Sequence, residues 1–144
     1  MKVSRNTKVA ILISAFTAFI LVNSCQTEQQ LTYGRYYMNG KVLYERHCQN
    51  CHNTDGVGLG LLIPPLTDSI YLNLNKSKLA CIIKYGLNEK IVINNKTYEE
   101  KMPSNKDLSE IDIAQLVVYI TNSFGNKQGL YDALEANKDL QKCQ

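Results

Sequence analysis

The chain has 144 residues, a length that fits one domain around a single hydrophobic core. Its hydrophobic content of 44% and charged content of 20% are ordinary for a folded protein. Lys2, Arg5 and Lys8 account for the whole formal charge of +3, so the chain after them is neutral and we expect no nucleic-acid partner.

The first 24 residues have the features of a secretory signal peptide. A basic start is followed by Val9–Val22, an apolar run that is short for a transmembrane helix. Ser24 precedes Cys25, and a small residue before a cysteine resembles the lipobox of bacterial lipoproteins, from which Asn23 departs. We therefore expect a signal peptide over residues 1–24, a lipid on Cys25 and a periplasmic, membrane-anchored protein. The alternative is an uncleaved or conventionally cleaved signal in which Cys25 is incidental.

Residues 25–38 are polar with scattered tyrosines, which predicts a tether between the lipid anchor and the folded domain. Asn39 and Gly40 then begin a helical pattern. The apolar stripe of this predicted helix contains Val42, Leu43 and Tyr44.

Cys48, Cys51 and His52 form the pattern Cys-x-x-Cys-His. On a helix these positions share one face, so two thiols and an imidazole converge on a single flat ligand. The pattern is the attachment signature of c-type haem. Two other interpretations are a zinc site that also uses His47 and a thioredoxin-like redox pair. The sequence contains no second pair of ligands for a zinc site and no βαβ unit around a thioredoxin-like redox pair.

On these residues the chain resembles the small class I cytochromes c over about residues 39–126. The resemblance implies an all-α cytochrome c fold, with three to five helices around one covalently bound haem c. It also implies a small hairpin before the loop of the distal ligand. In the family the two cysteines form thioethers and the histidine is the proximal iron ligand, which here are Cys48, Cys51 and His52.

Residues 53–60 contain too many glycines to continue a helix, so the chain turns there. The following Ile63–Leu66 segment resembles the family segment in which a proline carbonyl accepts a hydrogen bond from the proximal histidine, here His52. The sequence leaves open whether Pro64 or Pro65 does this. An extended loop that ends in prolines is the simpler interpretation and is compatible with this role.

The apolar spacing within Ser77–Tyr85 predicts a short helix that ends at Gly86. Ile91–Ile93 and Lys96–Tyr98 then flank two asparagines, which suit a tight hairpin turn. Tyr98 has two interpretations. The resemblance implies a contact with the haem edge or a propionate, whereas an ordinary side chain at this position would pack within the hairpin.

Met102-Pro103 lies shortly before the last predicted helix. The resemblance implies that Met102 is the distal iron ligand, since a soft, neutral thioether stabilises ferrous iron. A core methionine is the alternative, but the polar neighbours of Met102 provide no apolar stripe. Met38, the other methionine of the predicted mature chain, precedes the Cys-x-x-Cys-His pattern, where the family does not draw its ligand.

The last predicted helix has Ser109 as its N-cap, Asp112 at capping-box spacing and an end near Gly125. In the family a glycine and an aromatic residue of the first helix pack against a pair on the last helix. The corresponding residues are Gly40, Tyr44, Leu116 and Tyr119. Residues 127–144 form a C-terminal extension to which we assign no function.

Two cysteines remain outside the leader and the pattern. Cys81 lies in the apolar run Leu79–Ile83, which favours a small buried hydrophobic residue. A disulfide with Cys143 is the alternative, because the predicted export leads to an oxidising compartment.

With both axial positions filled, the implied function is one-electron transfer, so we expect an electron carrier and not an enzyme. The expected partners are respiratory redox proteins, and the expected state is a monomer. Residues 76–106 hold seven lysines that either steer acidic partners or form an ordinary solvated surface. One alternative function is a haem-based gas sensor or peroxidase-like enzyme with a labile methionine ligand. Another is a haem subunit dedicated to a respiratory oxidase or reductase complex.

Overall fold

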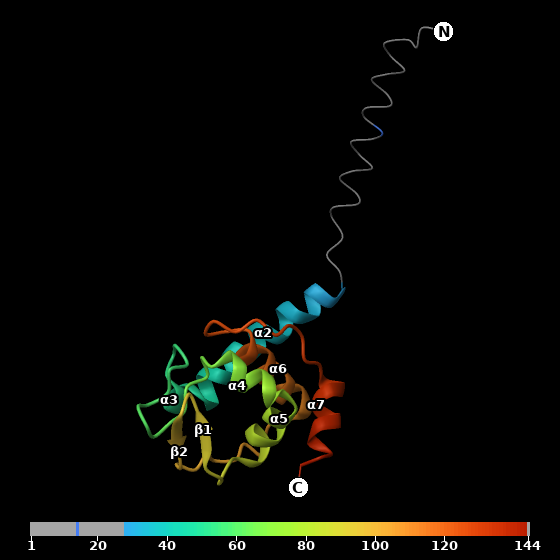
Figure 1. The fold of residues 1–144 in the computed structure, drawn as a ribbon. Helices are drawn as coiled ribbons and strands as arrows, with labels where there is room; N and C mark the ends of the chain where they lie inside the picture. The colour runs from blue at the N-terminus through green and yellow to red at the C-terminus, as the bar shows by residue number, and fades with distance from the viewer. Residues whose placement is uncertain (1–13, 15–27, 144) are drawn as a thin grey trace, which may run out of the picture. The chain divides into compact units, whose positions relative to one another are not determined.

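The computed structural model describes residue 14 and residues 28–143 (Figure 1). Cys25 and most of the predicted signal peptide lie outside these residues. The chain divides into two compact units, residues 1–32 and 33–144, and the fold below is that of the second. None of the helices in the described part of the chain has the length and hydropathy that a membrane crossing requires.

The fold is mainly helical, as predicted, with six helices and one hairpin among the described residues. The number exceeds the predicted three to five because the single turn α3 is separate from α2 and because the C-terminal extension is helical. In chain order the elements are α2 (Glu28–His47), α3 (Gln49–His52), α4 (Ser69–Leu74), α5 (Lys76–Tyr85), β1 (Ile91–Ile93), β2 (Lys96–Tyr98), α6 (Glu110–Thr121) and α7 (Ala133–Leu140).

α2 begins at Glu28 and not at Asn39, so residues 33–38 of the predicted tether belong to the folded domain. The three tyrosines of this stretch pack against the hydrophobic core. Tyr33 and Tyr37 also stack on each other, with ring centroids 6.1 Å apart. The scattered tyrosines are therefore one face of an otherwise polar helix.

α2 crosses α6 at Gly40, where there is no room for a side chain. A Cβ atom added to Gly40 would overlap the carbonyl group of Gln115 and lie 2.8 Å from the Cβ of Tyr119. Tyr44 is fully buried, and its ring centroid lies 5.2 Å from that of Tyr119. Leu116, the other predicted partner, is also fully buried. The predicted packing of the first helix on the last is confirmed.

α6 lies at the centre of the hydrophobic core. Every residue from Ile113 to Thr121 is buried. Ser109 and Asp112 form the predicted capping box at its start, in which each side chain accepts a hydrogen bond from the other residue's backbone N–H.

The predicted hairpin is confirmed in both position and turn. β1 and β2 pair antiparallel, with Ile91 opposite Tyr98. Asn94 and Asn95 have φ angles of 50° and 58°. A two-residue type I′ hairpin turn requires positive φ at both positions, and asparagine tolerates this conformation. Ile93 and Tyr98 are buried, so one face of the hairpin contributes to the interior.

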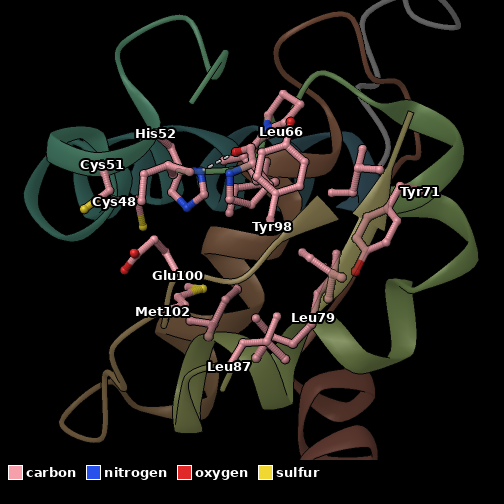
Figure 2. Close-up of a pocket in the computed structure, with 18 of the residues that line it drawn as sticks. Cys48, Cys51, His52, Leu66, Tyr71, Leu79, Leu87, Tyr98, Glu100 and Met102 are labelled. Carbon is pink, nitrogen blue, oxygen red and sulfur yellow. Dashed lines mark hydrogen bonds between the residues drawn. The ribbon is translucent and has the colours of Figure 1, made fainter. Parts of the chain in front are cut away.

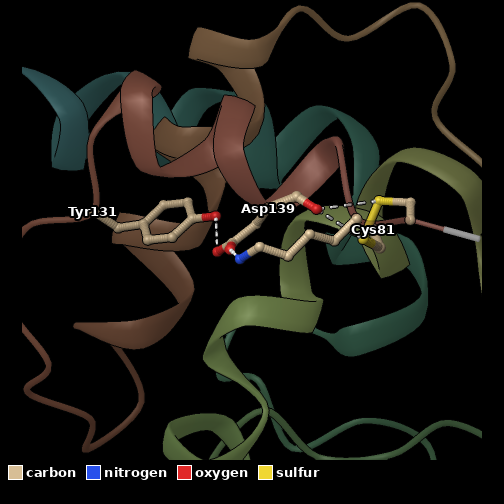
Figure 3. The surroundings of a disulfide bond; sticks show 5 residues. Cys81, Tyr131 and Asp139 are labelled. Atoms are coloured by element: carbon tan, nitrogen blue, oxygen red, sulfur yellow. Dashed lines mark hydrogen bonds and ion pairs between the residues drawn. A yellow bond between two sulfur atoms is a disulfide. The ribbon is translucent and has the colours of Figure 1, made fainter.

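The interpretation of Cys81 as a lone buried residue is wrong. Cys81 forms a disulfide with Cys143, and the two Cα atoms are 5.6 Å apart (Figure 3). The cause is α7, which packs on α5 and α6 and brings the end of the chain back to α5. Leu79, Ala80 and Ile83 of the same apolar run belong to the core.

Candidate functional site

An apolar cavity lies between α3, α5, the hairpin and the loop that carries Met102 (Figure 2). The cavity, together with the space at its opening to solvent, encloses about 1040 Å³. Its aliphatic lining residues are Ile63, Leu66, Leu72, Leu79, Ile82, Ile83, Leu87, Ile91, Ile93 and Ile120. Such a wall would shield a flat apolar cofactor from water.

The two cysteines of the Cys-x-x-Cys-His pattern line this cavity. The N–H groups of Cys51 and His52 both donate to the carbonyl of Cys48, at 3.1 and 2.9 Å, so the pattern is held in a helical turn. Cys48 is buried, Cys51 is exposed, and neither is in a disulfide. Burial, assisted by the neighbouring Cys51, raises the pKa of the Cys48 thiol to about 12, so this sulfur is protonated at neutral pH.

The two rival interpretations of the pattern find no support in the geometry. Among the described residues, no group of three or more His, Cys, Asp or Glu side chains is arranged to hold a metal ion, so the zinc site with His47 is absent there. The only sheet in the described part of the chain is the antiparallel hairpin, which is not the βαβ surround of a thioredoxin-like pair.

His52 is buried, and a hydrogen bond to a backbone carbonyl orients its ring. Nδ1 lies 3.1 Å from the carbonyl oxygen of Pro64, so of the two candidate prolines it is Pro64 that contacts the ring (Figure 2). A carbonyl can only accept, so Nδ1 carries the proton and Nε2 keeps its lone pair. Burial lowers the pKa of His52 and the hydrogen bond to Pro64 opposes this shift only in part, which favours the neutral imidazole.

Three further hydrogen bonds fold the chain back so that Pro64 reaches His52. The Tyr44 hydroxyl donates to the carbonyl of Asn53 at 2.6 Å, and the Asn53 side chain donates to the carbonyl of Gly58 at 2.6 Å. The N–H of Gly58 donates to the carbonyl of His52 at 3.2 Å. The sequence reasoning missed these roles. Asn53 was the available signal, because its φ of 62° is a conformation that asparagine tolerates better than most residues.

Met102 lines the cavity, and in Figure 2 it lies across the cavity from His52. Two hydrogen bonds with Leu87 fix the backbone of Met102. Met102 N–H donates to the carbonyl of Leu87 at 2.9 Å, and Leu87 N–H donates to the carbonyl of Met102 at 3.0 Å. Gly86 allows this approach, since it has a φ of 80° and a Cβ there would overlap the Met102 carbonyl.

The loop that follows the methionine is fastened to the last turn of α5. The Asn105 N–H donates to the carbonyls of Ile83 and Lys84, and its side chain donates again to Ile83. The Lys84 ammonium donates to the carbonyls of Lys106 at 2.7 Å and Leu108 at 2.5 Å. These contacts join residues that are distant in the sequence, so no local sequence pattern predicts them.

Tyr98 and Pro65 also line the cavity. Tyr98 is only 4% exposed and lies opposite Ile91 in the hairpin. Its two interpretations are therefore compatible, because the same ring packs in the hairpin and borders the cavity. Pro65 contributes to the wall next to the proline whose carbonyl contacts His52.

The charged side chains that line the cavity are Glu89, Glu100 and Lys101. Three of the seven lysines considered for steering are engaged within the fold. Lys90 pairs with Glu99 at 2.7 Å, and Lys76 and Lys84 donate to backbone carbonyls. Among the described residues that line the cavity, basic side chains are therefore not in excess. An exposed pair such as Lys90–Glu99 contributes little to stability.

The donor set of the cavity fits a covalently attached haem. One imidazole and one thioether face a common apolar space, which is the ligand combination of electron-transfer haems. Two thiols that are not in a disulfide lie at the same site, at the spacing required for two thioether links.

A family model described as cytochrome c oxidase, cbb3-type, subunit III matches residues 36–120 of the chain. The match covers more than half of the chain, and Cys48–His52 and Met102 lie inside it. No protein with a curated description matches. α7 and Cys143 lie beyond the end of the family match.

Proposed function

Because the chain belongs to the family of cbb3-type cytochrome c oxidase subunit III domains, which are c-type cytochrome domains, we propose that it is a mono-haem electron carrier with His52 and Met102 as axial ligands. Family membership establishes one covalently bound haem c, the all-α cytochrome c fold and haem-based electron transfer in general. The observation that carries the finer proposal is the buried imidazole of His52 facing the thioether of Met102 across one apolar cavity.

When bound, haem supplies an iron that exchanges one electron between Fe(II) and Fe(III). Cys48 and Cys51 would hold the porphyrin to the chain through thioether bonds. His52 would bind iron through Nε2, because Nδ1 donates its proton to Pro64. Pro64 therefore fixes both the tautomer and the ring plane of the ligand.

Met102 would supply a soft and neutral sulfur ligand, which favours ferrous iron and raises the reduction potential. A thioether is a weak ligand, so its position must be held by the surrounding chain. The paired hydrogen bonds with Leu87 and the attachment of Asn105 to α5 provide this support. Pro103 adds a fixed φ directly after the ligand.

A carrier is favoured over a gas sensor or peroxidase because two filled axial positions leave no site for a substrate. Addition of carbon monoxide to the reduced protein tests this. We expect the wild type to bind it slowly or not at all at neutral pH. Rapid binding by the wild type would support the sensor or peroxidase-like alternative and overturn the carrier.

We also propose that the protein is a periplasmic lipoprotein attached to a membrane through Cys25. The signal-like pattern of residues 1–24 supports this location, as does the periplasmic or extracellular occurrence typical of c-type cytochrome domains. The mass of the N-terminal peptide of the native protein is the test. We expect cleavage before Cys25 and a lipid on its sulfur, whereas an intact leader or an unmodified thiol would exclude the anchor.

A second function is favoured by the family match itself, whose description is of an oxidase subunit. In this alternative the domain serves only inside a respiratory complex. Gentle extraction followed by size-exclusion chromatography distinguishes the two. A free carrier runs as a monomer that exchanges electrons with soluble donors, and a dedicated subunit co-elutes with oxidase activity.

A further inference from the structure

The C-terminal segment, residues 127–143, packs on one side of α5, and another side of α5 lines the cavity. α7 contacts both α5 and α6. The cavity-lining residues of α5 are Leu79, Ile82 and Ile83. α5 is therefore a wall shared by the cavity and the C-terminal segment.

The C-terminal segment holds α5 at two separate points. At the start of α5, the Lys76 ammonium donates to the carbonyl of Gln128 at 3.3 Å and lies 5.9 Å from the ring centroid of Tyr131. In the middle of α5, Cys81 is bonded to Cys143 (Figure 3). Two attachments along one helix resist both its translation and its rotation.

The C-terminal segment is itself rigidly built. The buried Tyr131 hydroxyl donates to the Asp139 carboxylate at 3.0 Å, and the Lys142 ammonium lies 2.7 Å from the other oxygen of that carboxylate (Figure 3). Asp132 and Glu135 form a capping box at the start of α7. These contacts tie the residues before α7 to the residues at its end.

From α5 the support continues to the methionine. The last turn of α5 accepts the hydrogen bonds of Asn105, and the chain leaving α5 through Gly86 reaches Leu87, which pairs with Met102. A displacement of α5 would therefore move both segments that fix the backbone of Met102.

We propose that the C-terminal segment, fastened by the Cys81–Cys143 disulfide, is a brace that positions the Met102 loop for iron ligation. The inference rests on the proposed ligation by Met102. Cys81, Cys143 and Tyr131 are positioning residues, since none of the three lines the cavity and each acts through α5. Cys143 and Tyr131 lie beyond the family match, so the brace is an addition to the family domain.

The test compares amide hydrogen exchange at two positions of the purified haem-loaded protein. The distal reporter is the N–H of Met102, which donates to Leu87, and the proximal reporter is the N–H of His52, which donates to Cys48. In the double variant C81A/C143A we expect exchange at Met102 to accelerate about tenfold or more relative to exchange at His52. We also expect loss of the near-red band of sulfur-ligated ferric haem, with covalent haem content unchanged.

A matched control separates a local effect from general destabilisation. Tyr37→Ala removes an aromatic contact between α2 and α6, where the Tyr37 and Tyr119 ring centroids are 5.2 Å apart, and leaves α5 untouched. At an equal loss of thermal stability this variant should not accelerate exchange at Met102 in preference to exchange at His52. If C81A/C143A does the same, with no preference for Met102, the brace is overturned.

Two further measurements keep the inference testable. If the double cysteine variant fails to fold, Tyr131→Phe takes its place, because it removes only the hydrogen bond to Asp139. In Tyr131→Phe, exchange at Met102 should accelerate about two- to fivefold relative to exchange at His52. Equal acceleration of both amides there would overturn the brace. If the wild type itself lacked the near-red band, ligation by Met102 would fail, but the ratio of the two exchange rates would still decide whether the C-terminal segment supports this loop.

Discussion

The proximal and distal sides of the cavity are built in different ways. On the proximal side, the segment Cys48–Pro64 contains both thiols, the imidazole and the carbonyl that orients it. On the distal side, Met102 depends on Leu87, on the end of α5 and on hydrogen bonds from Asn105. Contacts within a short segment require little loop closure, whereas distant segments must be assembled at a larger entropic cost. We expect loss of the proposed proximal ligand to abolish haem attachment, and loss of the proposed distal ligand to change iron ligation while the haem stays attached.

The largest effect is expected from His52→Ala. Loss of the buried imidazole removes the proposed proximal ligand, so the variant should retain essentially no covalent haem. Intact mass and a haem stain after denaturing electrophoresis provide the measurement. His47→Ala is the matched control, because His47 is an exposed imidazole outside the cavity lining and its loss should change neither readout.

Met102→Ala should have the next largest effect and confine it to the distal side. The variant should keep its covalent haem but bind carbon monoxide rapidly when reduced, and its reduction potential should fall. The fall should be well within the range of about 0.8 V that axial ligands span. Redox titration and stopped-flow mixing provide the measurements.

Met38→Ala is the control for this prediction, because Met38 is 59% exposed on α2 and does not line the cavity. It should leave both the potential and the binding of carbon monoxide unchanged. If the two methionine variants behaved alike, Met102 would not be the distal ligand.

Gly40→Ala, a change near the proximal side of the cavity, should lower the free energy of unfolding. Its Cβ would overlap the backbone of Gln115, and overpacking of this kind costs about 1–3 kcal/mol or more, in excess of the gain of about 1 kcal/mol in helix propensity. Gly34→Ala, in the same helix, has no atom within 4 Å of the added Cβ and should stabilise by about 0.5–1 kcal/mol. Denaturant unfolding of both variants measures the difference. Equal effects in the two would contradict the close crossing of α2 and α6.

The smallest expected effect is on the free energy of unfolding at alkaline pH. It involves two buried tyrosines, Tyr44 and Tyr131. Burial is the main cause that raises the pKa of Tyr44, near the haem-attachment pattern, and of Tyr131, in the C-terminal segment. The unfolded chain releases these protons near pH 10 while the folded protein keeps them. The stability they contribute is therefore complete below about pH 10 and lost as the pH rises above it.

Tyr131→Phe should make the loss of stability above pH 10 less steep. At pH 7 the same variant should lose about 1 kcal/mol through the missing hydrogen bond to Asp139. Unfolding curves recorded between pH 7 and pH 12 measure both effects. A slope identical to that of the wild type above pH 10 would show that Tyr131 titrates normally in the folded protein.

The same division explains what could be predicted from the sequence. The Cys-x-x-Cys-His pattern, the capping box of Ser109 and the two asparagines of the hairpin are local signals, and the structure has each of these elements where the sequence predicted it. The choice of Pro64 over Pro65 was not predictable, because it depends on how the glycine-rich loop folds back on Asn53.

The sequence-based predictions are wrong where the structure depends on contacts between segments that are distant in the chain. The start of α2 was misplaced because the tyrosines of residues 33–38 become an apolar face only when a core is present. Cys81 was misread because its apolar neighbours suggested burial, and only the return of α7 to α5 provides its partner Cys143. The attachment of Asn105 to α5 had no signal in the sequence for the same reason.

The near-red absorption of the purified ferric protein, recorded together with its intact mass, tests the central claim most directly. We predict the mass of one covalent haem on the chain and the charge-transfer band of sulfur-ligated ferric haem, a band that disappears in Met102→Ala. One covalent haem without this band, or a band that survives Met102→Ala, would contradict ligation of iron by His52 and Met102.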